Sequence, residues 1–266
     1  MKKIWIIIRK EWDEVFRNRI VLYTTIGVPL LFSAIPIGIL SGLQGATDMS
    51  SLESELGMGM GAEMMAQLCG TLQGVDCGQY LLLQQFMILF LMMPAIIPVT
   101  IAAYSIVGEK NTRTLEPLLA TPISTEELLA GKALAAVIPA VVGSFSSFFI
   151  FVAGANFLAS PAVAAQLFSP LWLLGIFTVG PLLSLAGVSL AVMISSRVSE
   201  PRAAEQLTAL LVLPITALFM GQLFGLLVVD QTFMLWVAAG LVLVDAALLF
   251  FAVQLFQREN ILTRWK

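Results

Sequence analysis

Long apolar runs alternate with short polar segments along almost the whole chain. A membrane-spanning helix needs about 20 apolar residues to cross about 30 Å of hydrocarbon. Six runs reach this length with at most one charged residue each. They lie near residues 20–42, 80–106, 133–155, 170–195, 207–229 and 233–256. The pattern predicts an all-α membrane protein with six transmembrane helices, folded as a single transmembrane domain over residues 1–266.

Several of these runs contain proline, which removes one helical hydrogen bond. The prolines are Pro29, Pro36, Pro94, Pro98, Pro139, Pro181 and Pro214. Membrane helices tolerate proline where neighbouring groups satisfy the freed carbonyls. We therefore expect kinked helices rather than shorter ones.

The polar segment before the first run, residues 3–19, has a helical pattern of its own. Its apolar side chains recur at helical spacing: Ile4, Ile8, Trp12, Val15 and Phe16. Charged side chains fill the opposite face, which predicts an amphipathic helix lying in the membrane interface, with Trp5 and Trp12 at headgroup depth. The alternative is a plain extension of the first span into the cytoplasm.

The composition changes the picture from a merely apolar protein to one that uses lipid as its solvent. The chain is 59% hydrophobic and only 12% charged, with a mean hydropathy of +0.94. Soluble domains carry about 25% charged residues, and a domain of this size has too little interior to hide so much apolar surface. Membrane lipid is an expected partner and nucleic acid is not.

The basic residues give the orientation, because Lys and Arg concentrate in cytoplasmic segments. All of them precede the first span, follow the last, or lie between spans two and three or four and five. They are Lys2, Lys3, Arg9, Lys10, Arg17, Arg19, Lys110, Arg113, Lys132, Arg197, Arg202, Arg258, Arg264 and Lys266. We expect a multi-pass protein of the cell (cytoplasmic) membrane with both termini in the cytoplasm.

The link between the first two spans, residues 43–79, is long, acidic and predicted to lie outside the cell. It contains the two cysteines of the chain, Cys69 and Cys77. Disulfides persist in extracytoplasmic compartments, and two cysteines eight residues apart can close a small loop. A disulfide is the favoured interpretation, with two free thiols as the alternative.

The same link is rich in methionine, which is a soft ligand suited to Cu(I). The methionines are Met58, Met60, Met64 and Met65. Because no fixed ligand spacing accompanies them, a short amphipathic helix is favoured over a copper site. We expect no metal site in this chain.

The absence of histidine narrows the chemistry. It removes Ser–His and Cys–His nucleophile pairs and most zinc sites. The pair Gly131-Lys132 superficially suggests a phosphate-binding loop, but Glu126 stands where the first glycine belongs and Ala133 follows the lysine. The sequence predicts no catalytic residues and no ATP hydrolysis by this chain.

One acidic residue, Asp245, lies inside a predicted span. Ionisable residues within membranes are costly and commonly functional. A functional acid and a protonated or hydrogen-bonded acid that supports the bundle interior are equally compatible with the sequence. In either case we expect Asp245 to face protein rather than lipid.

The segment 108–132, "GEKNTRTLEPLLATPISTEELLAGK", joins spans two and three on the cytoplasmic side. Its apolar positions predict a short helix that ends at Pro122, after which Ser124 and Glu127 form a capping box for the next helix. The pattern is compatible with a helix pushed by a cytoplasmic partner and with a well-capped turn that has none.

This segment resembles the signature of the membrane-spanning permeases of type-2 ABC transporters. In that signature a Glu ends the second span, then Thr-Leu-Glu, a Leu pair, a Pro and a Gly-Lys follow. The matching positions are Glu109, Thr114, Leu115, Glu116, Leu118, Leu119, Pro122, Gly131 and Lys132. The basic N-terminal segment and the stretch before span five are also similar to elements of this family.

The resemblance implies a membrane subunit of an ATP-driven exporter that moves a lipid-like, drug, peptide or ion substrate outward. It implies a second permease copy, two separate ATPase subunits that bind ATP and Mg²⁺, and a coupling helix between spans two and three. The ATPase-coupling residues would then be Glu109, Arg113, Thr114, Leu115, Glu116, Leu118 and Leu119. Many relatives carry re-entrant helices after span five, where the predicted link in this chain is short.

Two other functional classes remain open from the sequence. One is a membrane anchoring or assembly component without transport. The other is a secondary transporter, which is disfavoured because such proteins use several midplane polar groups and internal repeats, and this chain has one intramembrane acid and no visible repeat.

Overall fold

The computed structural model describes residues 2–42, 75–112, 123–195, 200–224 and 226–255, together with Cys69, Leu72 and Val198. Within these residues every regular element is a helix. Six of the helical stretches are long and apolar enough to cross a membrane. The predicted all-α architecture with six spans is confirmed.

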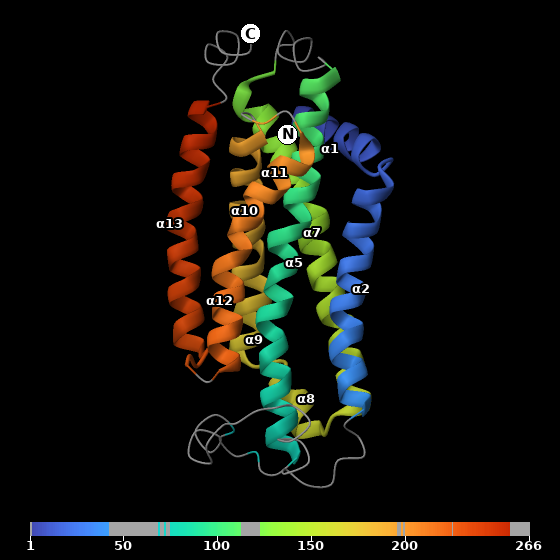
Figure 1. The fold of residues 1–266 in the computed structure, drawn as a ribbon, viewed down its shortest axis with the longest axis vertical. Coiled ribbons are helices and arrows are strands. Elements are labelled where there is room, and N and C mark those ends of the chain that lie inside the picture. The colour runs from blue at the N-terminus through green and yellow to red at the C-terminus, as the bar shows by residue number, and fades with distance from the viewer. Residues whose placement is uncertain are drawn as a thin grey trace.

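The spans run alternately up and down a single bundle (Figure 1). They are α2 (Arg19–Gly42), α5 (Val75–Thr112), α7 (Thr125–Leu158), α9 with η2 and α10 (Pro170–Leu174, Gly175–Val179, Gly180–Ser195), α11 with η3 and α12 (Pro201–Thr208, Ala209–Leu211, Val212–Leu223), and α13 (Gln231–Leu255). The short helix α8 (Pro161–Gln166) lies at one end. At the other end α1 (Lys2–Val15) lies across the bundle. We call these the α8 end and the α1 end.

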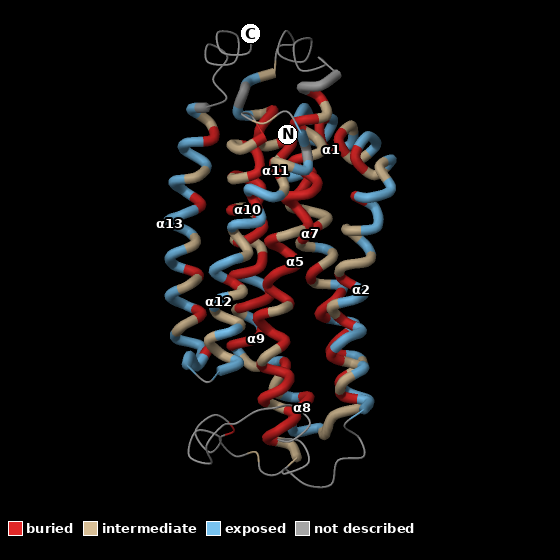
Figure 2. Tube along the Cα trace, viewed as in Figure 1, coloured by how far each residue is buried: buried red, intermediate tan, exposed pale blue. Residues whose placement is uncertain are grey.

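The helix α5 is the central column of the bundle (Figure 2). In its most apolar window 89% of the residues are buried, against 17% in the corresponding windows of the α11–α12 span and of α13. The helices α2, α7, α10 and α12 all pack against it. The outer spans therefore present most of their apolar surface outward, as expected for helices in contact with lipid.

Close contacts between small residues hold α2 against α7. A Cβ atom at Gly154 would lie 2.6 Å from Ile37 Cδ1, so a larger residue there would require the Ile37 side chain to shift. Both the Ser33 and Ser147 hydroxyls donate to the carbonyl oxygen of Pro29, each over 2.7 Å. Such small and hydroxylated residues are typical of helix interfaces in membranes.

Proline does not end the helices, as expected. The helices α2, α5 and α7 continue through their internal prolines. In the fourth span a π-helical turn, η2, ends two residues before Pro181, and such a turn is one way in which a helix accommodates a local change of register.

The helix bounds differ from the apolar runs mainly at the ends. The second span begins at Val75 and continues to Thr112, and the third begins at Thr125 rather than near residue 133. Hydropathy stops at the first charged residues, whereas the helical hydrogen bonds continue through them. Segment 113–122 falls outside the described residues, and the predicted coupling helix lies there.

The fifth span ends at Leu223, before residue 229 where the apolar run ends. The backbone amides of Leu226 and Leu227 both donate to the carbonyl oxygen of Gly221, which turns the chain. The Gln84 side chain then donates to the Val229 carbonyl oxygen over 2.9 Å. Residues in this turn are as apolar as the helix before it, so composition could not separate the two.

Candidate functional site

The helix α1 rests directly on the first turns of α7. A Cβ atom built at Gly131 would lie 2.7 Å from Ile7 Cγ2 and 2.9 Å from Ile7 Cβ. The Trp12 indole N–H donates to the carbonyl oxygen of Ala135 over 2.8 Å. Gly131 thus permits the close approach of α1. This packing accounts for the glycine of the Gly131-Lys132 pair without a role in nucleotide binding.

Lys132, the second residue of the pair, has a structural role as well. Its ammonium group lies 2.8 Å from Glu11 Oε1, 2.7 Å from Glu109 Oε2 and 2.8 Å from Ser105 Oγ. These contacts match the three donors of a lysine side chain. The Ser105 hydroxyl also donates to Glu11. Lys132 of α7 therefore joins α1 to α5.

Lys10 completes the group on its more exposed side, with its ammonium 2.5 Å from Glu109 Oε1. The side chains of Lys132 and Glu11 are 3% exposed and that of Glu109 is 5% exposed, whereas that of Lys10 is 36% exposed. We call Lys10, Glu11, Ser105, Glu109 and Lys132 the charge cluster. Its two cations balance its two carboxylates, as buried charges require.

The pairing shifts two pKa values in opposite directions. Burial by itself would raise the pKa of the Glu11 carboxyl, but the Lys132 charge and the hydrogen bonds from Lys132 and Ser105 hold it below its usual range. Burial would likewise lower the pKa of Lys10, but its hydrogen bond and charge contact with Glu109 raise it above the usual value. Both shifts favour the charged forms of Glu11 and Lys10 around neutral pH.

Local sequence signals place these groups. Glu11 lies on the buried stripe of α1 with Ile7, Ile8 and Val15, so folding of that helix carries its carboxylate into the interface. The helix α7 begins with the expected capping box: the Glu127 amide donates to Ser124 Oγ, and the Ser124 amide donates to Glu127 Oε2. A partly exposed ion pair of 3.5 Å between Lys3 and Glu127 adds a second link from α1 to α7.

The charge cluster lies at the two helix ends that flank the segment between α5 and α7. Glu109 is three residues before the end of α5, and Lys132 is in the second turn of α7. Of the predicted coupling residues, Glu109 is in the cluster. The others lie outside the described residues: Arg113, Thr114, Leu115, Glu116, Leu118 and Leu119.

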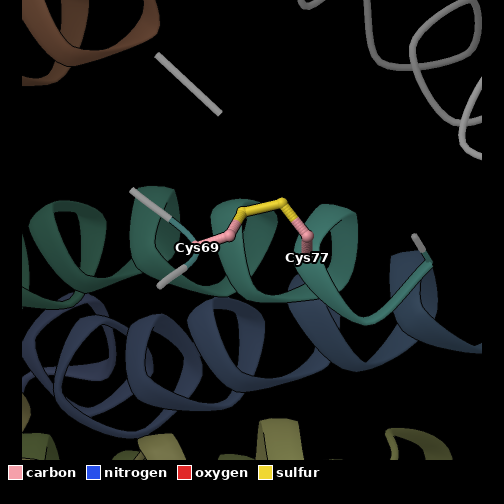
Figure 3. Close-up of a disulfide and its surroundings, with 2 residues drawn as sticks. All are labelled: Cys69 and Cys77. Atoms are coloured by element: carbon pink, nitrogen blue, oxygen red, sulfur yellow. A yellow bond between two sulfur atoms is a disulfide. The ribbon is translucent and has the colours of Figure 1, made fainter. Parts of the chain in front are cut away.

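The cysteines lie at the opposite end of the molecule, next to the start of α5. The Cα atoms of Cys69 and Cys77 are 5.3 Å apart, and Figure 3 shows their sulfur atoms joined. This separation is within the usual range for a disulfide. The methionines considered as copper ligands, Met58, Met60, Met64 and Met65, lie outside the described residues.

Asp245 lies on the buried face of α13 and is only 3% exposed. Neither of its carboxylate oxygens has a hydrogen-bond partner among the described residues. It is far along the chain from the charge cluster and is not part of it.

Sequence reasoning found Glu109 but missed Glu11, Lys10 and Ser105. The signal for Glu11 was present, because it stands between Ile8 and Val15 on one helical stripe, where a charged residue needs a partner. The apolar stripe that we expected on this helix was centred closer to Trp12 and Phe16 than the stripe that is buried in the structure. In the structure Trp12 bonds to α7, whereas Trp5 and Ile6 are exposed.

Comparison with known proteins gives one result. The family model described as ABC-2 family transporter protein matches residues 5–255. The match extends from α1 to the end of α13 and so includes the charge cluster, the segment between α5 and α7, and all six spans. No curated protein matches the chain.

Proposed function

The chain belongs to the ABC-2 transporter family, and we propose that it is the permease subunit of an ATP-driven exporter. Two copies would form a homodimer and bind two separate ATPase subunits, which hold ATP and Mg²⁺. The cargo would be a lipid-like molecule, a drug, a peptide or an ion that moves outward. Membership of the family implies an ABC ATPase as partner, and the direction, cargo and stoichiometry are our proposals.

The observation that carries this proposal is the charge cluster at the two helix ends that flank segment 113–122. A partner that pushes on this segment would act on the end of α5 and the start of α7 together, since Lys132 links Glu109 to Glu11. It would move α1 as well. A surface turn without a partner has no need of such a buried, charge-balanced anchor, which is costly to desolvate.

The cluster would then act as a rigid joint between the ATPase and the spans. Its ion pairs connect α1, α5 and α7, and α5 is the central column that contacts most other spans. Leu115, Leu118 and Leu119 would fill an apolar groove on the ATPase, with Glu109, Arg113 and Glu116 at the polar rim. A displacement of this joint would move α5, and with it the bundle interior, directly through these ion pairs.

The proposal places the α1 end in the cytoplasm and the α8 end outside. The distribution of Lys and Arg supports this orientation. We propose that Cys69 and Cys77 form a disulfide outside the cell, supported by their Cα separation of 5.3 Å. Mass spectrometry without reductant should find a peptide pair two hydrogens lighter than the dithiol, and alkylation of both thiols in the untreated protein would contradict the disulfide.

The test uses the permease reconstituted in lipid nanodiscs with its ABC ATPase. The wild-type permease should change the rate of ATP hydrolysis by the bound ATPase. Lys132→Met should retain the ATPase but lose this effect, because the joint no longer connects α7 to α1 and α5. The matched control, Lys3→Met at the exposed ion pair with Glu127, should behave like the wild type.

The alternatives predict other outcomes. An anchoring or assembly component would bind the ATPase without changing its hydrolysis rate in any variant. A secondary transporter would not bind the ATPase at all. Either result would overturn the proposed function.

A further inference from the structure

The helix α13 is attached to the bundle along one narrow stripe. Its buried residues are Met234, Ala238, Asp245 and Ala252, spaced four and seven residues apart, and they recur on one helical face. The stripe packs mainly against α10, α9 and η2. We call the contact of this stripe with α10, α9 and η2 the seam. Among the described residues of α13, the other buried members of the stripe are apolar, and Asp245 is the one buried polar side chain.

Asp245 is close to the middle of its span. It stands fourteen residues after Gln231 and ten before Leu255, which corresponds to about 21 Å and about 15 Å of helix at about 1.5 Å per residue. The hydrocarbon core is about 30 Å thick. Neither end of the helix is therefore close enough for the short Asp245 side chain to reach water.

Within the described residues, the elements that pack against α13 carry no charged residue near the middle of the membrane. The helical segments α9, η2 and α10 contain no Asp, Glu, Lys or Arg. The charged residues of α7, which also touches α13, are Glu126, Glu127 and Lys132 in its first turns at the α1 end. Lys132 is already engaged by Glu11 and Glu109.

We propose that Asp245 is a proton-binding site, a neutral carboxylic acid enclosed between α13 and α10. An ionised carboxylate without a partner is strongly disfavoured at this depth. A metal cation would need several oxygen ligands, whereas the neighbouring positions on the α13 side are Leu241, Ala238 and Ala252, and the described residues contain no group of three or more His, Cys, Asp or Glu that could hold a metal. A proton needs no ligand besides the carboxylate itself.

The proton makes attachment of α13 sensitive to pH. In the packed seam Asp245 keeps its proton at neutral pH, whereas an aspartate exposed to water releases its proton at this pH. Linkage then requires that the packed form is favoured at low pH and weakened as the pH rises. Loss of the proton places an unpaired negative charge in the seam, which favours separation of α13 from α10. This inference is independent of the proposed export function.

Infrared spectroscopy of the protein in lipid bilayers at neutral pH tests the protonation state directly. The difference spectrum between the wild type and Asp245→Asn should show loss of one carboxylic-acid C=O band and no loss of carboxylate bands. The matched control is Asp230→Asn at the start of the same helix, where Asp230 is exposed and caps the Phe233 amide. That difference should show loss of carboxylate bands only.

The opposite result for Asp245 would overturn the proposal: loss of carboxylate bands would mean an ionised group held by a bound cation or by water. A second measurement keeps the test independent of the assignment of bands. Thermal melting of the wild type should shift to lower temperature as the pH rises through neutrality, and this shift should be smaller in Asp245→Asn. Equal pH dependence in both proteins would also contradict the proposal.

Discussion

The molecule buries acidic side chains in two contrasting ways. At the α1 end Glu11 and Glu109 are held within 2.8 Å of Lys132 and belong to a cluster with no net charge. In the seam between α13 and α10, Asp245 is buried to the same extent and has no hydrogen-bond partner among the described residues. The exposed fraction of the side chain is nearly the same, but the chemistry around it is opposite.

This contrast separates two uses of a buried acid. A fully paired acid is fixed in space, because any movement breaks strong contacts, and this suits a joint that transmits displacement. An unpaired acid at mid-membrane exchanges its charge for a proton, and this suits a contact that responds to pH. The following changes test each half of the contrast, from the largest expected effect to the smallest.

Removal of the central cation should have the largest effect. Lys132→Met leaves Glu11 and Glu109 buried together without the lysine, and breaking a buried pair in this way costs about 3–5 kcal/mol. Thermal or denaturant melting in detergent should show this loss. Lys3→Met, at a half-exposed pair, should cost less than about 1 kcal/mol. Equal stability of the two variants would contradict a structural role for the cluster.

Closing the space above Gly131 should have the next largest effect. Gly131→Val would overlap Ile7, and overpacking of this kind costs about 1–3 kcal/mol. The second change Ile7→Ala removes Cγ2 and Cδ1 but keeps Cβ, so the double variant should recover part of the stability lost. A double-mutant cycle that shows no coupling between the two positions would contradict direct packing of α1 on α7.

The cluster should lose its contribution at both extremes of pH. Because the Glu11 pKa is lowered, its contribution is complete above the ordinary Glu value of about 4.3 and is lost as the pH falls through the lowered value. Because the Lys10 pKa is raised, its contribution is complete below about 10.4 and is lost as the pH rises through the raised value. Glu11→Gln should flatten the acid side of the stability profile and leave the alkaline side in place.

The smallest effect is expected at Asp245. Because Asp245 has no hydrogen-bond partner among the described residues, Asp245→Leu should lower stability at neutral pH by no more than about 0.5 kcal/mol. Melting at neutral pH measures this directly. A loss as large as that of Lys132→Met would show that Asp245 has partners and would remove the contrast between the two sites.

The sequence was sufficient for the six spans, the capping box at Ser124 and the buried position of Asp245, because each depends on local composition and helical spacing. It was insufficient for the partners of Glu11 and Lys132, which are separated by 121 residues in the chain. Their contact depends on how α1 lies across the bundle, and no local pattern contains that information. The end of the fifth span was missed for a different reason, since the turn at Leu226 and Leu227 is as apolar as the helix.

The central proposal is that the ABC ATPase binds the α1 end through segment 113–122. The direct test is the affinity of the ABC ATPase for the permease in nanodiscs, compared between the wild type and the double change Leu118→Ala with Leu119→Ala. Loss of two buried anchors should weaken binding by about 30-fold, equivalent to about 2 kcal/mol. The control is Leu226→Ala with Leu227→Ala, in the turn after the fifth span and away from the α1 end. This variant should bind the ATPase as the wild type does. Unchanged affinity in the first double variant would contradict the central claim.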